Sequence, residues 1–318
     1  MDEGRARSRV RVARGMADHA RKFAAAGLRP AVPRDAATVI LVRPAAGTDG
    51  AAGTDGAAGV EVYLLQRTEA LEFAPGACVF PGGSVDERDA DPGIAETSWA
   101  GPAPADFGHL LGVPAEHARA LVCAAVRETF EESGVLLAGP SPAELVPDSA
   151  ELARDRRALL AGSLSLGELL ARRGLLLRAD LLTPWTRWIT PEFSPRRFDT
   201  WFFAAALPAG QLAGLAAAGS GEAGSGEARS GTSESGASES GESDSGSWWR
   251  PSAALAAARA GQITLLPPTA VTLAELAAYQ DVEGILAERR TITPLLPEVV
   301  VEDDRVWLAM PESIEYPL

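Results

Sequence analysis

Three glutamates with helical spacing are the residues of this 318-residue chain best suited to chemistry. They lie in the stretch Arg-Glu-Thr-Phe-Glu-Glu-Ser-Gly-Val, residues 127–135. Glu128, Glu131 and Glu132 stand at i, i+3 and i+4, so in a helix their carboxylates share one face and converge. Carboxylates that close raise each other's pKa unless positive charge intervenes. The spacing therefore predicts a site for a divalent cation.

The predicted cation is Mg²⁺ or Mn²⁺, because both are hard ions that bind carboxylate oxygens. Zinc prefers cysteine and histidine ligands, and the few residues of those types form no ligand-spaced cluster. They are Cys78, Cys123, His19, His109 and His117. The alternative to a metal site is a solvated helix face on which Arg127 and Glu131 form an ordinary i,i+4 ion pair. The following residues favour the metal site, since Gly134 ends the helix and an apolar, strand-like run begins at 135–137.

Hydrophobic patterning predicts the elements that position these acids. The acid-bearing helix starts at Pro114 or Ala115 and ends at Ser133. Its inward face is predicted to consist of Leu121, Val122, Ala125, Val126 and Thr129. Upstream, residues 37–42 and 60–65 are rich in β-branched and aliphatic residues, so we expect two strands that pair as a hairpin.

A second motif, Phe80-Pro81-Gly82-Gly83, precedes the acids. Together the two motifs resemble the signature box of the Nudix hydrolases, Gly-x5-Glu-x7-Arg-Glu-apolar-x-Glu-Glu-x-Gly-apolar. The interval from Gly83 to Arg127 is 44 positions (127 − 83), where the box has 14, so 30 residues are inserted. Thr129 replaces the apolar residue of the box. Asp89, with Asp86 and Glu87 nearby, falls where the first box glutamate belongs, and no role is assigned to it.

This split box is similar to the branch of the family that includes a peroxisomal coenzyme A diphosphatase. The resemblance implies an α/β fold, a Nudix-type α/β/α sandwich with a mixed sheet, extended here by C-terminal helices. It implies hydrolysis of a diphosphate linkage with Mg²⁺ or Mn²⁺ as cofactor. Glu128, Arg127 and Glu131 would be catalytic, and Glu128, Glu131 and Glu132 would bind the metal. Gly82 and Gly83 would let the backbone approach the metal and the phosphates.

Part of a coenzyme A signature also precedes the glycine motif. Arg67 and Gly76 match its spacing, whereas Tyr63, Leu65, Thr68 and Glu72 depart from it. The match favours coenzyme A or its acyl esters as substrate, the esters more than free coenzyme A. The alternatives are a pyrophosphatase for ADP-ribose, a dinucleotide or another nucleoside diphosphate derivative, and a nucleotide sensor without turnover.

An aromatic segment that contains arginines follows at residues 185–203. Its residues either contact the ligand or form scaffold, and Arg196 and Arg197 are the predicted phosphate contacts, since guanidinium groups fork onto phosphate oxygens. The resemblance to the coenzyme A signature implies that Arg67 also binds substrate. Trp188 and Phe202 are expected in the core. Asp199 is expected to pair with Arg196 or Arg197.

Composition divides the chain into one core with appended segments. We expect a flexible N-terminal tail at 1–34 and a hydrolase core at 35–210 with a loop at 45–59 and an insert at 84–113. A disordered Gly/Ser/Glu-rich linker is expected at 219–247, because it has too little apolar surface to offset its ordering entropy. Helices and a closing hairpin at 248–318 are expected to pack on the core.

Overall composition limits the class of protein. The formal net charge is −14, so the chain lacks the basic footprint that nucleic acid requires. No apolar run approaches the ~20 residues of a membrane span, and the N-terminus has no secretory apolar region. Two distant cysteines suit a reducing compartment, so we expect a cytoplasmic enzyme that acts on a small-molecule diphosphate. A homodimer is compatible with the sequence.

Overall fold

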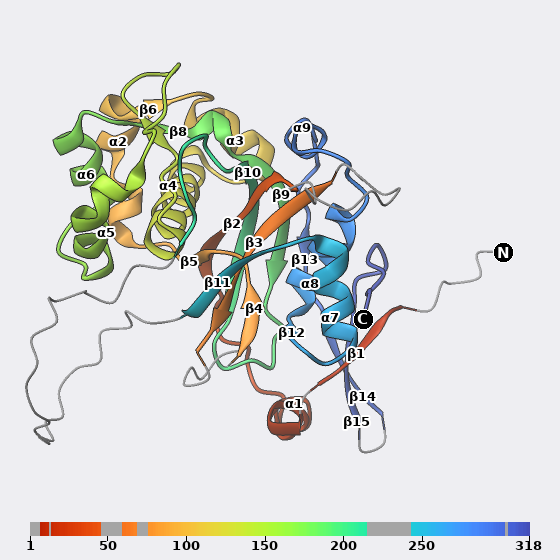
Figure 1. The fold of residues 1–318 in the computed structure, drawn as a ribbon. Coiled ribbons are helices and arrows are strands. Elements are labelled where there is room, and N and C mark those ends of the chain that lie inside the picture. Colours follow the sequence, from red (N-terminus) through yellow and green to blue (C-terminus); the bar gives the residue numbers. More distant parts are fainter. Residues whose placement is uncertain (1–6, 13, 46–58, 69–75, 215–242, 303–304) are drawn as a thin grey trace, which may run out of the picture.

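The computed structural model describes residues 7–12, 14–45, 59–68, 76–214, 243–302 and 305–318 (Figure 1). In this described part, a nine-stranded mixed sheet forms the centre of the molecule. Its main path runs β12 (Thr264–Leu265), β4 (Ala77–Val79), β3 (Val60–Arg67), β2 (Arg34–Pro44), β10 (Phe198–Ala206), β9 (Thr183–Ile189) and β13 (Pro294–Leu295). Off this path, β5 (Gly82–Ser84) pairs with β2, and β11 (Ser243–Trp249) pairs with β3.

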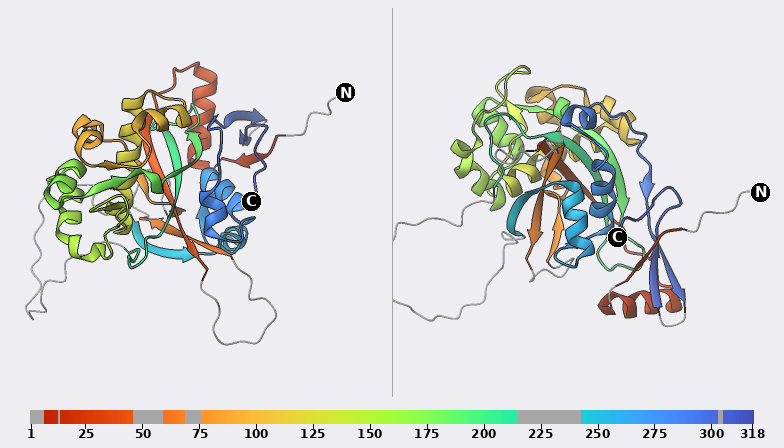
Figure 2. Two further views of the ribbon diagram at one scale, coloured as in Figure 1. Left: turned by 90° about the horizontal axis from the view of Figure 1, so that it is seen from above. Right: turned by 45° about the vertical axis from the view of Figure 1, so that its right-hand side comes forward.

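Helices cover both faces of this sheet (Figures 1 and 2). On one face the sheet packs against α4 (Ala115–Ser133), and the two share a large apolar core. On the other face lie α7 (Pro251–Arg259), α8 (Pro267–Leu276) and α9 (Val282–Leu286), which enclose a second core. The predicted α/β/α arrangement with a mixed sheet and helical C-terminal additions is confirmed.

The hairpin predicted at 37–42 and 60–65 is formed by β2 and β3. The strands are antiparallel, with Val42 opposite Val62, and Ala45 N–H donates to the Gly59 carbonyl at 2.8 Å. The middle of β2 is buried on both faces, as a nearly continuous apolar run requires. The strands therefore close on the loop predicted at 45–59, of which residues 46–58 lie outside the described part.

The acid-bearing helix has the predicted bounds. α4 begins after Pro114 and ends at Gly134, whose φ of 75° is the left-handed conformation that glycine adopts readily at a helix end. All five residues predicted to face inward are buried. The helix is therefore held along its length by the sheet, with its acids near the C-terminal end.

The insert and the residues after α4 build a lobe around this helix (Figure 1). The insert contributes η1 (Glu87–Ala90), α2 (Pro92–Thr97), β6 (Trp99–Ala100) and α3 (Pro104–Leu111). The later residues contribute β7 (Ala138–Gly139), η2 (Ser149–Leu152), α5 (Ala153–Leu160), α6 (Leu166–Arg173), β8 (Leu176–Arg178) and η3 (Ala179–Leu181). A small sheet in the order β6-β8-β7 ties the two parts together.

The strand predicted at 135–137 is wrong, although these residues are fully buried. The Leu136 backbone bonds to a side chain in place of a neighbouring strand. Its N–H donates to Gln211 Oε1 at 2.9 Å, and its carbonyl accepts from Gln211 Nε2 at 3.0 Å. The side-chain amide of Gln211 thus makes the two hydrogen bonds that a neighbouring strand would make to Leu136. The strand β7 begins only at Ala138.

The flexible tail predicted at 1–34 is also wrong for its described residues. β1 (Arg9–Arg11) pairs with β15 (Arg305–Ala309), which pairs in turn with β14 (Glu298–Glu302), and α1 (Arg14–Ala26) follows β1. Arg7 and Arg9 pair with Glu298 and Glu302, both at 2.7 Å. Pairing with the C-terminal hairpin, nearly 300 residues away, therefore orders the N-terminal segment.

The linker predicted at 219–247 needs a similar correction at its end. Residues 243–247 belong to β11, which pairs with β3, and Trp248 packs on Tyr63 with ring centroids 5.3 Å apart. The aromatic anchor explains why the polar residues before it join the sheet. Residues 219–242 lie outside the described part. Among the described helices, none has both the length and the apolar character needed to span a bilayer.

Candidate active site

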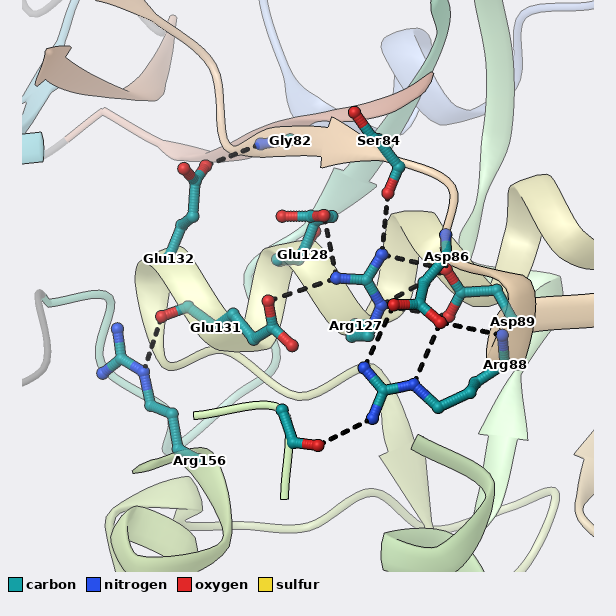
Figure 3. Close-up of polar contacts among 12 residues, drawn as sticks. Gly82, Ser84, Asp86, Arg88, Asp89, Arg127, Glu128, Glu131, Glu132 and Arg156 are labelled. Atoms are coloured by element: carbon teal, nitrogen blue, oxygen red, sulfur yellow. Dashed lines mark hydrogen bonds and ion pairs between the residues drawn. The ribbon is translucent and has the colours of Figure 1, made fainter. Parts of the chain in front are cut away.

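The glycine motif lies directly over the acid-bearing helix (Figure 3). β5 pairs with β2 so that Gly83 is opposite Ala37 and Gly82 opposite Thr38. A Cβ atom on Gly82 would lie 2.5 Å from the Ala37 carbonyl oxygen, and one on Gly83 would lie 2.5 Å from Glu128 Oε1. Both positions require glycine, because the backbone here touches both the sheet and the carboxylate.

Arg127 is the centre of the polar network beneath this turn. The residue is only 8% exposed. Nη1 donates to Glu128 Oε1 at 2.8 Å and to Glu131 Oε2 at 3.2 Å, and Nη2 donates to the Ser84 carbonyl at 2.9 Å. Arg127 thus pairs with Glu131, the i,i+4 partner, and also with Glu128, and the same guanidinium connects both glutamates to the strand β5.

Asp89, to which the sequence analysis assigns no role, completes the network. It is 1% exposed and receives Arg127 Nε at 3.0 Å and Nη2 at 2.9 Å. Its other contact is the Asp86 N–H at 2.8 Å, within a capping box that starts η1. The signal for this partner was the spacing of six residues after Gly83. The first part of the box therefore keeps its place against α4, and within the segment 84–113 the residues additional to the simple box follow Asp89.

Burial perturbs the acids of this network. It raises the pKa of Glu128 to about 7, and it also raises the pKa of Glu131. Arg127 brings one positive charge, whereas Asp89, Glu128 and Glu131 together bring three carboxylates. The network thus has surplus negative charge in a poorly solvated place, which is the setting that favours a bound cation.

The predicted convergence of all three metal-binding glutamates is not seen. Glu128 and Glu131 point toward Arg127, while Glu132 Oε2 accepts the Gly82 N–H at 2.7 Å (Figure 3). Within the described residues, no three side chains of the types His, Cys, Asp and Glu form a ready ligand group. Like charges separate when each carboxylate finds a donor in the chain. The donor set still suits Mg²⁺ or Mn²⁺, because it consists of hard oxygens on one helix turn.

The predicted substrate-binding arginines lie at different places. Arg67 is half-buried at the last position of β3, and Arg196 is exposed in the turn before β10. Arg197 is only 7% exposed and donates to the carbonyls of Ala31 at 2.7 Å and Thr190 at 3.0 Å. This use of Arg197 argues against the predicted phosphate contact, because its guanidinium holds the scaffold together.

The predicted partner of Asp199 is wrong as well. Asp199 binds Arg187 through two hydrogen bonds of 2.7 and 2.8 Å. The strand register explains this choice, since Arg187 on β9 faces Trp201 on β10 and lies diagonally across from Asp199. Arg187 also lies over the Trp201 ring, 4.2 Å from its centroid. Trp188 and Phe202 are buried, as predicted.

Comparison with known proteins shows similarity to one family. The family model described as the NUDT19 Nudix domain matches residues 107–211, which include α4 and its three glutamates. The acyl-coenzyme A diphosphatase NUDT19 of Gallus gallus is 31% identical over 211 residues, which cover 55% of this chain and 55% of that protein. Its counterpart in Xenopus laevis is 30% identical over 185 residues, covering 47% and 48%. The chain thus spans about half the length of these curated relatives.

A solved structure extends the similarity beyond the matched segment. The crystal structure of a NUDIX hydrolase from Alicyclobacillus acidocaldarius aligns with a TM-score of 0.56 and 27% sequence identity. The alignment covers 82% of this chain and 98% of that chain. The likeness therefore includes most of the fold and not only the helix that carries the acids.

Proposed function

We propose that this chain, which resembles the Nudix hydrolases in sequence and in fold, hydrolyses a diphosphate linkage with a divalent cation and water. The observation that carries this proposal is the cluster beneath the glycine turn, where Arg127 binds Asp89, Glu128 and Glu131 at once. In this cluster, several carboxylate oxygens lie beside the Gly82-Gly83 turn, whose residues have no Cβ atoms. Divalent cations carry the opposite charge to these carboxylates, and the glycine turn leaves room for the phosphates that such cations bind.

The chemical demand matches these residues. A diphosphate resists hydrolysis because its anionic oxygens shield phosphorus, so the catalyst must neutralise charge and aim a water molecule in line. A bound Mg²⁺ or Mn²⁺ would supply that neutralisation and a more acidic water. We assign Glu128, Glu131 and Glu132 as the metal-binding residues. Arg127 orients the first two, and Gly82 and Gly83 leave room for the phosphates.

Glu128 has a second suitable property. Its pKa of about 7 and its place beneath Gly83 suit a group that accepts a proton near neutral pH. The residue is therefore assigned as a metal ligand or a general base. Glu131 and Glu132 lie on the next turn of the same helix and complete the set.

We propose coenzyme A or an acyl-coenzyme A as the substrate. Two observations support this choice: the partial coenzyme A signature at Arg67 and Gly76, and the similarity to the acyl-coenzyme A diphosphatases NUDT19. Water would attack one phosphorus of the diphosphate and break the bond to the bridging oxygen. The products are 3′,5′-ADP and phosphopantetheine or its acyl ester.

A substrate panel tests this function. The full chain is incubated with Mg²⁺ or Mn²⁺ and separately with coenzyme A, acyl-coenzyme A, ADP-ribose and a dinucleotide, and products are identified by mass spectrometry. We expect 3′,5′-ADP from the coenzyme A substrates and none in the presence of EDTA. Release of AMP from ADP-ribose, with coenzyme A left intact, would move the assignment to the nucleoside diphosphate class. No cleavage of any diphosphate would refute the proposed activity.

A further inference from the structure

Arg156 is a buried cation at the end of the acid-bearing helix that the sequence did not single out. It comes from α5 and is 8% exposed. Within the described part of the chain, Arg127 and Arg178 are buried arginines that pair with carboxylates. Arg156 instead donates to two main-chain carbonyls, Nε to Glu131 at 3.0 Å and Nη2 to Gly214 at 3.0 Å.

These bonds act on the last turn of α4. The final carbonyls of a helix have no partner within the helix and need donors from elsewhere. In α4 the Phe130 carbonyl accepts the Gly134 N–H, and the Ser133 carbonyl accepts the Gly214 N–H at 2.7 Å. The Glu131 carbonyl accepts Arg156 Nε. Residues outside the helix thus hold the turn that carries Glu131 and Glu132. Arg156 contacts this turn directly through Glu131, and it also holds Gly214, whose N–H binds Ser133.

The charge of Arg156 acts in the same place. A cation at a helix C-terminus opposes the negative end of the helix dipole. Glu131 and Glu132 are the carboxylates whose charges act on this guanidinium. A Cβ atom on Gly134 would lie 2.7 Å from Arg156 Nη1, so the glycine that ends the helix also makes room for the arginine. Figure 3 shows the guanidinium beside the Glu131 carbonyl.

We propose that Arg156 is a positioning residue that sets Glu131 and Glu132 for metal binding. It holds the backbone of their turn in place through its bonds to the Glu131 and Gly214 carbonyls. Supporting residues of this kind typically change metal affinity by about 10- to 100-fold when they are removed. This inference rests on the proposed function, because the affinity of the glutamates for a divalent cation is the property it explains.

The test compares Mn²⁺ affinity in substituted full-length chains by calorimetry, at a temperature where each is folded. Arg156→Met removes both donors and the charge, and we expect affinity to fall about 10-fold or more. Arg156→Lys keeps the charge, but the lysine ammonium lacks the planar guanidinium geometry that lets Arg156 donate to both carbonyls. We therefore expect an intermediate affinity. Arg157→Met changes the exposed neighbour on the same helix and should leave affinity unchanged.

A burial-matched control separates positioning from general stability. Arg197→Met removes another buried arginine whose donors go to carbonyls, and it should lower the melting temperature without lowering Mn²⁺ affinity. Wild-type affinity in folded Arg156→Met would overturn the inference, and so would wild-type affinity in Arg156→Lys if the Met variant does not fold. A wild-type chain that binds Mn²⁺ but cleaves no diphosphate would refute the proposed function alone. A wild-type chain that binds no Mn²⁺ would refute both.

Discussion

Single residues decide how closely the glycine turn and the acids approach each other. Gly83→Ala would place a Cβ atom 2.5 Å from Glu128 Oε1, so the carboxylate must move. Displacement of a reacting group by about 1 Å lowers rates by about 100-fold, and we expect a loss of kcat of that order. Gly59→Ala is the control, because its Cβ meets only the far end of Arg250 at 3.4 Å. Equal kcat in the two variants would contradict this close-packed arrangement.

The raised pKa of Glu128 predicts that the free energy of unfolding, measured in EDTA, depends on pH. Its folded-state pKa is raised by burial from 4.5 to about 7, so between these values the folded protein holds a proton that the unfolded chain has released. Stability is therefore highest below the unfolded value and falls as pH rises through 7, by up to about 3 kcal/mol. Urea unfolding at pH 5 and pH 8 measures this, and Glu128→Gln should reduce the decline. An identical decline in both proteins would refute the assignment of the shift to Glu128.

Among the elements, the segment after α4 depends on one side chain. Gln211 is 2% exposed and bonds to the Leu136 N–H, the Leu136 carbonyl and the Val146 carbonyl. Gln211→Leu leaves these buried groups without partners, and each unsatisfied group costs about 1–3 kcal/mol. We expect a loss of at least about 3 kcal/mol in urea unfolding. Gln262→Leu, an exposed change, should cost little, and similar losses in both variants would argue against the role of Gln211.

The closed end of the β2–β3 hairpin leads us to expect that the loop between the two strands can be shortened. Ala45 N–H already bonds to the Gly59 carbonyl at 2.8 Å, so the strands are closed before the loop begins. Replacing residues 46–58 by an Asn-Gly turn should leave the rate of hydrolysis within about twofold of wild type. A larger loss of kcat at unchanged melting temperature would show that the loop takes part in the reaction.

The elements also show what sequence patterns can and cannot predict. The bounds of α4 and the β2–β3 hairpin follow from local signals, namely apolar periodicity, a terminal glycine and β-branched runs. The partners of the site do not. Asp89 is 38 residues from Arg127, and Gln211 is 75 residues from Leu136, so only the folded chain brings them together. Arg156 binds carbonyls, which leave no trace in residue types.

At the scale of the whole molecule, the two termini stabilise each other away from the active site. β1 completes the sheet of β15 and β14, and Arg7 and Arg9 pair with the C-terminal hairpin. Deleting residues 1–12 should lower the melting temperature by about 5 °C while leaving Mn²⁺ affinity unchanged. Deletion of residues 1–6 keeps β1 and is the control. Loss of Mn²⁺ binding in the longer deletion would show that the termini reach the site.

The most direct test of the account replaces the acids of α4 without changing their size. Mn²⁺ binding and diphosphate hydrolysis are measured for the wild-type chain, for Glu131→Gln and Glu132→Gln, and for Glu116→Gln, an exposed change at the start of the same helix. We predict that the two site variants unfold at nearly the wild-type temperature but lose at least about 10-fold in Mn²⁺ affinity and almost all turnover, while Glu116→Gln keeps both. Wild-type metal affinity and turnover in Glu131→Gln and Glu132→Gln would contradict the proposed site.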